Sequence, residues 1–279
     1  MIWPSSLSVS IVAYAPSKRE LANTLRSLSV AVSKAKETGA LSASRLTLVD
    51  NGPTQSDYEL LVGLVDSPEV VSAFERRDVI TGHGNIGFGA GHNLAIAASD
   101  AEVHLILNPD VSLHSESIGK GLECLARNRD VVLVSPKAFW PGGNQQYLCK
   151  RYPSIFDLFL RGFAPEWLRK VFRERLSNYE MRDVCRDEVE IGIPIASGCF
   201  MLARREALVG IGGFSERFFM YFEDFDLSIR IREIGEIAYC PEVEIVHSGG
   251  RAARKGWRHI RMFLRSAWIF FRRHGFRWF

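Results

Sequence analysis

The chain has 279 residues, of which 47% are hydrophobic and 24% are charged, and this composition is typical of one large folded domain or of a domain with an elaboration. The five cysteines are odd in number and widely spaced and include no C-x-x-C pair, so they indicate neither a disulfide framework nor a zinc knuckle and favour a reducing cytoplasm. The formal net charge of +3 hides an asymmetry, because residues 1–250 carry −6 while residues 251–279 carry nine Lys or Arg and no Asp or Glu.

The first residues enter a strand-like run directly, without the basic, apolar and cleavage regions of a signal peptide. No uninterrupted apolar stretch approaches the roughly 20 residues that a membrane-spanning helix needs. We therefore expect a protein that is neither exported by this route nor threaded through a bilayer.

Alternating and helical hydrophobic patterns take turns over the first 110 residues. Strands are predicted at residues 8–14, 46–49, 79–80 and 103–107, and helices at residues 21–39 and 89–99. This order predicts an α/β fold with a mostly parallel sheet. Ligands of such sheets bind beyond the carboxyl ends of the strands, where Tyr14, Asp50 and Asp110 fall.

The alternation is lost after Asp110, and residues 140–190 mix Pro, Gly, aromatic and charged residues. We interpret this stretch as an insertion, with helices predicted at residues 155–160 and around residues 167–176. A strand pattern returns at residues 193–202, a helix is predicted from Asp224, and another apolar strand covers residues 243–246.

A glycine-rich segment at residues 81–93 leads into the helix at residues 89–99. The backbone of this segment and the amides of the first helical turn could approach an anion. The loop contains a literal G-x-G-x-x-G at Gly82, Gly84 and Gly87, and Asp110 follows at about the interval found in dinucleotide sites. A nicotinamide or flavin enzyme is therefore a rival interpretation. A very short preceding strand and the unexplained acids elsewhere in the chain argue against it.

Three acids lie within four residues, at Glu223, Asp224 and Asp226, flanked by Phe222 and Phe225. Acids in the first turn of a helix cap amides and offset the dipole, which would explain any one of them. Three exceed that need, and one could be desolvated and act as a general base.

Two strand-end residues are candidate metal ligands. Asp110 follows an apolar strand and a proline, so its carboxylate could bind a hard cation, although a plain turn aspartate would look the same. His247 follows the apolar strand predicted at residues 243–246. A lone histidine at a strand end is more often structural, but it could bind a cation that a carboxylate also holds.

Taken in order, these motifs resemble glycosyltransferase family 2 and, within it, the rhamnosyltransferase-like branch. The resemblance covers about residues 7–250 and rests on the following segments: Val12-Ala13-Tyr14, Val49-Asp50-Asn51, residues 85–93, Asn108-Pro109-Asp110, Ser197-Gly198, Gly212-Gly213-Phe214, residues 222–226 and His247. It implies one nucleotide-diphospho-sugar transferase (GT-A-like) domain and sugar transfer with inversion. The family's Asp-x-Asp is here Asn108-Pro109-Asp110, so Asp110 is its one remaining acid.

The resemblance also implies roles for individual residues. Asp224 would be the general base, oriented by Glu223 and Asp226, while Asp110 and His247 would hold Mg²⁺ or Mn²⁺ against the diphosphate. Asp50 would accept the imide N–H of uracil or thymine. The predicted nucleotide-sugar site comprises Ala13, Tyr14, Asp50, Asn51, Asn85, Gly87, Asn93, Asn108, Asp110, Ser197 and Gly198.

The implied activity moves a sugar, with rhamnose favoured, from a dTDP or UDP donor to a hydroxyl of a lipid-linked or cell-surface glycan. Residues 7–120 would bind the nucleotide sugar and residues 121–250 the acceptor. Two other interpretations stay open. A nucleotidyltransferase would need more basic residues in the N-terminal loop than Lys18 and Arg19, and an inactive membrane-associated binding protein is disfavoured by the intact acids.

The basic and aromatic segment at residues 251–279 is predicted to bind an anionic membrane peripherally, at the inner face of the cytoplasmic membrane. An apolar helical face is expected from Ile260, Phe263, Leu264, Ala267 and Phe271. Packing of this helix on the domain is the competing interpretation. Nucleic acid is disfavoured as a partner because the rest of the chain carries −6 and would repel a polyanion.

Overall fold

The computed structural model describes residues 4–249 and 256–279. Its strands are β1 (Ser6–Ala13), β2 (Ala43–Asp50), β3 (Arg76–Ile80), β4 (Val103–Leu107), β5 (Val111–Leu113), β6 (Val131–Phe139), β7 (Gln145–Gln146), β8 (Glu190–Ile191), β9 (Phe200–Arg204) and β10 (Glu236–His247). Its helices are α1 (Lys18–Glu37), α2 (Gln55–Val65), α3 (Pro68–Ala73), α4 (Phe88–Ala97), α5 (Ser117–Arg127), α6 (Ile155–Gly162), α7 (Glu166–Val171), α8 (Arg173–Tyr179), α9 (Arg205–Gly210), α10 (Glu223–Ile231) and α11 (Gly256–His274).

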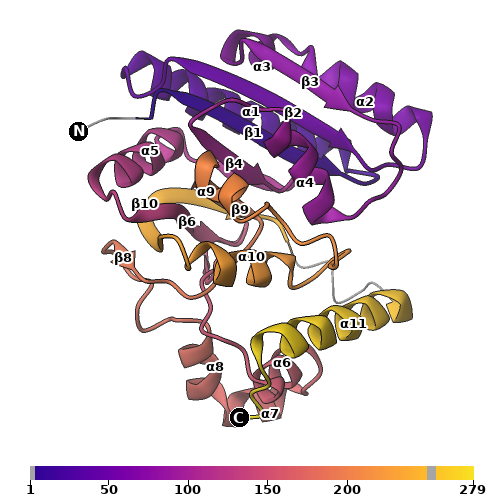
Figure 1. Ribbon diagram of the computed structural model, residues 1–279, viewed down its shortest axis with the longest axis vertical. Coiled ribbons are helices and arrows are strands. Elements are labelled where there is room, and N and C mark those ends of the chain that lie inside the picture. The colour runs from indigo at the N-terminus through magenta and orange to yellow at the C-terminus, as the bar shows by residue number, and fades with distance from the viewer. Residues whose placement is uncertain (1–3, 250–255) are drawn as a thin grey trace.

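One sheet runs through the molecule in the order β3-β2-β1-β4-β9-β6-β10-β5 (Figure 1). β1 pairs in parallel with β2 and β4, β2 pairs in parallel with β3, and β6 with β10, whereas β9 runs antiparallel to both of its neighbours. This confirms the predicted α/β fold with a mostly parallel sheet.

Two layers of helices cover the sheet. Side chains of α1, α3 and α5 pack with the strands into one aliphatic core, which includes Leu25, Val70 and Leu122. On the opposite face, α4, α9 and α10 contribute Ile96, Leu208 and Leu227 to a second core. Both cores explain the apolar periodicities of the sequence, since each helix turns its hydrophobic stripe to the sheet.

The second half departs from the predicted elements. α5 and β6 were not predicted, the strand expected at residues 193–202 begins only at Phe200, and the charged helix expected around residues 167–176 is broken into α7 and α8. Residues 193–199 instead form a bend that is held by isolated hydrogen bonds, such as the one from the Lys150 amide to the Ile195 carbonyl at 2.9 Å. Apolar alternation alone does not separate such a buried bend from a strand.

The C-terminal helix α11 packs on the domain, as the competing interpretation of the basic segment predicted (Figure 1). Phe270 and Phe271 are buried in an aromatic cluster with Phe218 and Phe222 of the domain. The predicted membrane-facing set is therefore wrong in part, because Phe263, Ala267 and Phe271 face this cluster while Leu264 is exposed. Residues 251–255 of the predicted segment lie outside the described residues.

The part of the chain that the structure describes contains no helix long and apolar enough to cross a membrane.

Candidate active site

The strand register brings the predicted site residues to one edge of the sheet. Ala13 is the partner of Asp50 across β1 and β2, and Leu107, which precedes Asn108, is the partner of Ile11. His247 is the partner of Val111, the residue after Asp110. Because β1, β2 and β4 are parallel, their carboxyl ends open on the same side, where ligands of such sheets bind.

Asp50 lines a pocket of about 220 Å³ between β2, α2 and the loop after β3. Its carboxylate is almost fully buried and accepts the Gly52 amide at 2.9 Å and the Thr81 hydroxyl at 3.0 Å. Tyr58 also lines this pocket, and Tyr14 stands exposed (58%) after β1. A carboxylate has about four acceptor positions, so Asp50 keeps the capacity to accept a ligand N–H.

The loop before α4 is shaped by hydrogen bonds among three predicted residues. The Asn51 side chain donates to the Gly87 carbonyl at 2.9 Å, and the Asn85 side chain accepts the Gly87 amide at 3.1 Å. Gly87 has a φ of 92°, and a Cβ there would lie 2.4 Å from the Phe219 carbonyl oxygen. Glycine is therefore required both by this φ and by the close backbone contact to the 219 segment.

Asn93 was predicted to contact the nucleotide sugar, but the structure engages it elsewhere. Its side chain donates to the Phe214 carbonyl and accepts the Phe214 amide, both at 2.8 Å. Through these two hydrogen bonds, the Asn93 side chain links α4 to the turn after α9. The geometry thus gives Asn93 a structural role.

Asp110 and His247 form the predicted pair. The His247 Nε2 lies 3.5 Å from the Asp110 Oδ1, and Nδ1 donates to the Gln146 side-chain oxygen at 3.0 Å. Burial lowers the pKa of His247, but the neighbouring Cys199 and Asp110 side chains raise it to about 10.

The donor set of this pair fits a divalent cation. The Gln146 amide oxygen accepts Nδ1–H, so a cation that displaced the Nε2 proton would find the Nε2 lone pair on the side that faces Asp110, and an outer oxygen on the other ring nitrogen is usual for a metal-binding histidine. Among the described residues no cluster of three or more His, Cys, Asp or Glu forms a metal site. One or two protein ligands completed by substrate phosphates is an ordinary arrangement for Mg²⁺.

A short stretch of backbone joins this pair to the acidic cluster. The Asn108 amide donates to the Cys199 carbonyl at 2.9 Å, and the next residue back, Gly198, donates its amide to the Asp224 Oδ2 at 2.9 Å. A Cβ at Gly198 would lie 3.2 Å from the Asp224 Cβ and from the Phe88 ring, so this close approach favours glycine. Ser197 and Gly198 therefore lie between the candidate metal pair and Asp224.

Asp224 and Glu223 begin α10 in a weakly solvated place. Burial raises the pKa of Asp224, although the amides of Gly198 and Phe225 and the charge of Arg161 lower it. Burial and the neighbouring Asp224 charge raise the pKa of Glu223 to about 8. A buried carboxylate with such a pKa is a candidate acid or base.

The turn that presents these acids is strained. Tyr221 and Phe222 both have left-handed backbone conformations, with φ of 71° and 66°. Each such residue costs on the order of 1–3 kcal/mol and persists only where its surroundings hold it. Here the Phe222 ring lies against Phe225, Phe263 and Phe270 at centroid distances of 5.3, 5.2 and 5.2 Å.

Asp226 does not face the other two acids in a shared site. Its side chain is 0% exposed and its oxygens accept from Arg230 at 2.8 Å and from Arg273 and His274 at 2.9 Å each. These partners tie α10 to the end of α11. The orienting role of Asp226 stays a prediction, and the structure adds contacts that the sequence did not indicate, because Arg273 and His274 lie 47 and 48 residues away.

The sequence analysis missed several residues of the site. Thr81 and Tyr58 border Asp50, Gln146 orients His247, and Arg161 acts on the Asp224 charge. Thr81 opens the glycine loop and could have been found from its position one residue after β3. The other three come from segments without a recognisable motif.

The chain was compared with known proteins. Residues 8–212 match the model of glycosyl transferase family 2. The N-acetylglucosaminyl-diphospho-decaprenol L-rhamnosyltransferase of Mycobacterium tuberculosis is 27% identical over 278 residues, which cover 95% of this chain and 83% of that protein. Rhamnosyltransferase WbbL of Escherichia coli is 25% identical over 182 residues, 61% of this chain and 63% of that protein.

Solved structures share the fold at low identity. GalNAc-T7 with UDP, GalNAc and Mn²⁺ is similar with a TM-score of 0.60 and 14% identity over 88% of this chain, and this chain spans 44% of that protein. Residues 1–349 of S. aureus TarS are similar with a TM-score of 0.57 and 13% identity over 92% of this chain and 64% of the solved chain.

Proposed function

Because the chain belongs to glycosyl transferase family 2 and is a glycosyltransferase, we propose that it moves rhamnose from a dTDP or UDP donor to a hydroxyl of a lipid-linked glycan, with inversion. The named relatives support this choice, since both are rhamnosyltransferases and one is named for an acceptor carried on diphospho-decaprenol. Residues 7–120 would bind the donor and residues 121–250 the acceptor.

The observation that carries the proposal is the position of Asp224. Its carboxylate is held by the Gly198 amide, one residue from the backbone bond that joins β9 to Asn108. A base at this position lies beside the candidate diphosphate-binding residues but is not one of them. Such an arrangement suits a displacement in which acceptor and leaving group occupy opposite sides of one carbon.

The proposed step transfers one proton and exchanges one bond. The acceptor hydroxyl loses its proton to the Asp224 carboxylate while its oxygen bonds to the anomeric carbon of the donor sugar. The bond from that carbon to the diphosphate oxygen breaks, and the nucleoside diphosphate leaves with the electron pair. A single displacement inverts the anomeric configuration, and the raised pKa of Asp224 favours proton acceptance.

Asp110 and His247 would hold Mg²⁺ or Mn²⁺, and this cation would supply charge neutralisation at the departing diphosphate. Asp50, Tyr58 and Thr81 would bind the nucleoside in the pocket beside β2. The two ends of the donor are thus assigned to the carboxyl ends of β2 and β4, which lie on either side of β1 in the sheet.

We further propose that the protein is cytoplasmic and lies peripherally on the inner face of the membrane. The outer side of α11 supports this, because it exposes Trp257, Leu264 and Trp268 together with Arg261 and Arg265. Full-length Trp257→Ala/Trp268→Ala should sediment less than wild type with vesicles that contain phosphatidylglycerol, at equal thermal stability. Equal sedimentation of the two proteins would reject this surface.

The test of the activity is transfer measured with dTDP-rhamnose and UDP-sugars and a prenyl-diphosphate-linked N-acetylglucosamine, with Mn²⁺ or with EDTA. The expected result is release of one nucleoside diphosphate per glycoside formed, and a product whose anomeric configuration is opposite to that of the donor. In a separate calorimetric arm, Asp110→Ala should weaken Mn²⁺-dependent binding of the nucleoside diphosphate. Nucleotide binding without any transfer would instead support an inactive binding protein.

A further inference from the structure

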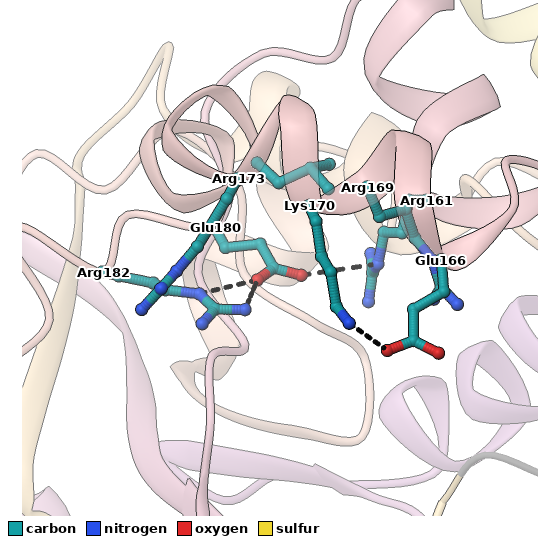
Figure 2. Close-up of a pocket in the computed structure, with 8 residues that line it drawn as sticks. Arg161, Glu166, Arg169, Lys170, Arg173, Glu180 and Arg182 are labelled. Atoms are coloured by element: carbon teal, nitrogen blue, oxygen red, sulfur yellow. Dashed lines mark hydrogen bonds and ion pairs between the residues drawn. The ribbon is translucent and has the colours of Figure 1, made fainter.

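A second cavity lies away from the candidate active-site edge, among α6, α7, α8 and the chain that follows α8 (Figures 1 and 2). It has a volume of about 410 Å³. It is lined by Arg161, Glu166, Arg169, Lys170, Arg173, Leu176, Glu180 and Arg182. Five cations and two carboxylates give this wall a formal charge of +3.

The two carboxylates are already paired. Glu180 lies 2.5 Å from the Arg182 guanidinium and 3.7 Å from that of Arg161, and Glu166 lies 3.2 Å from the Lys170 ammonium (Figure 2). Arg169 and Arg173 are exposed, and within residues 4–249 and 256–279 neither has an ion-pair partner. The cavity therefore offers two uncommitted guanidinium groups next to three committed cations.

The cavity lies on the acceptor side of the candidate base. Arg161, on its wall, is near enough to Asp224 to stabilise that carboxylate's charge. The pocket around Asp50 shares no residue with it. The helices of the cavity also expose apolar side chains to solvent, namely Phe163, Trp167 and Val171.

We propose that this cavity binds the diphosphate of an isoprenoid-linked acceptor, with Arg169 and Arg173 as its principal ligands and the lipid along Phe163, Trp167 and Val171. The proposal rests on the function proposed above and names the recognition element of its acceptor. Arginine is suited to this task, because its planar guanidinium binds phosphate oxygens in a bidentate manner and stays charged.

The concentration of charge favours a diphosphate over a bilayer surface as the occupant. Five cations around one open pocket match a group with two or three negative charges, whereas a phosphatidylglycerol headgroup carries one. A flat anionic surface would be met equally well by an exposed face of basic residues, such as that of α11. Binding a single diphosphate between α7 and α8 requires several cations close together, as this cavity provides.

The first experiment measures binding of farnesyl diphosphate to the full chain, with the nucleotide site saturated by a nucleoside diphosphate. Arg169→Ala/Arg173→Ala should weaken binding about 10-fold, because two charge-assisted contacts to phosphate oxygens are lost. Arg26→Ala/Arg76→Ala removes the same charge from α1 and β3 and should leave binding unchanged. Both pairs are exposed, so equal melting temperatures are expected and provide the control for folding.

Several results would overturn the proposal. Equal affinity of the two double variants would remove the assigned ligands, and displacement of the probe by the nucleoside diphosphate would place it in the donor site. Equal affinity for farnesyl monophosphate would show that no diphosphate is recognised. If Arg169→Ala/Arg173→Ala lost affinity for phosphatidylglycerol vesicles but kept its affinity for farnesyl diphosphate, the cavity would be part of a membrane-binding surface.

The second experiment separates this proposal from the proposed function. Transfer is measured to N-acetylglucosamine carried either on a prenyl diphosphate or on an uncharged alkyl chain. Arg169→Ala/Arg173→Ala should raise KM about 10-fold for the charged acceptor alone, with kcat and the donor KM unchanged. An equal effect on both acceptors would overturn the diphosphate site, whereas absence of transfer by the wild type would refute the function and leave the binding experiment to decide on the cavity.

Discussion

The two sides of the active site are built in different ways. At the proposed nucleotide edge, polar residues follow strands of an aliphatic sheet and bond largely to backbone groups, as in Asp50 to the Gly52 amide or Asn51 to the Gly87 carbonyl. On the proposed acceptor side, the strained turn at Tyr221 and Phe222 is held by aromatic rings of α11, and an ion pair between Asp226 and Arg273 ties α10 to the same helix. The first side depends on backbone topology and the second on long-range side-chain contacts.

This difference predicts where single substitutions act most strongly. The largest effect is expected at Asp226, because Asp226→Ala removes the buried carboxylate that accepts from Arg230, Arg273 and His274. Breaking a buried pair of this kind costs about 3–5 kcal/mol of unfolding free energy. Urea denaturation followed by fluorescence measures the loss.

Asp183 provides the matched control. It forms a bidentate pair with Arg151 at 3.0 and 2.8 Å, but its side chain is half exposed. Asp183→Ala should therefore cost less than about 1 kcal/mol. Equal losses for the two variants would contradict the idea that the α10 to α11 ion pair holds the acceptor side together.

A second prediction concerns Glu223 and pH. Its pKa is raised to about 8, so between pH 4.5 and 8 the folded protein holds a proton that the unfolded chain releases. The Glu223 contribution to stability therefore falls as pH rises through this window, by roughly 3 kcal/mol between pH 5 and pH 8. Glu223→Gln should remove this slope, which thermal unfolding at several pH values would show, and an unchanged slope would mean that Glu223 is solvated.

The smallest of the three effects is expected at Asn93, where the structure replaces a predicted sugar contact by a link to Phe214. Asn93→Ala leaves the Phe214 amide and carbonyl without this partner and should cost about 2 kcal/mol of unfolding free energy. Nucleoside diphosphate affinity should stay at the wild-type value. Weaker nucleotide binding at unchanged stability would restore the predicted contact.

The same difference explains how far the sequence could be interpreted. The strands that end at Ala13, Asp50 and Leu107 were predicted because alternation and turn residues are local signals, and the fold confirms them. The pairing of Asp110 with His247 followed from both being strand ends. The contacts of Asp226 with Arg273 and of Asn93 with Phe214 were not predicted, because these partners lie 47 and 121 residues away and local sequence does not distinguish such a contact from a ligand contact.

Residues of the proposed acceptor side were also difficult to predict from the sequence. Arg161, Arg169 and Arg173 lie in a stretch without periodicity, and only the arrangement of α6, α7 and α8 collects them around one cavity. The basic segment at residues 251–279 was recognised as a separate element, but hydrophobic spacing alone did not tell whether Phe263 and Phe271 would meet lipid or protein.

The most direct test of the account is the rate of sugar transfer by Asp224→Asn, measured together with its affinity for the donor nucleotide. If Asp224 accepts the acceptor proton while Asp50, Asp110 and His247 hold the donor, transfer should fall at least about 10²-fold and nucleotide affinity should not change. Transfer above about a tenth of the wild-type rate, or a parallel loss of nucleotide binding, would contradict the assignment of Asp224 as the base.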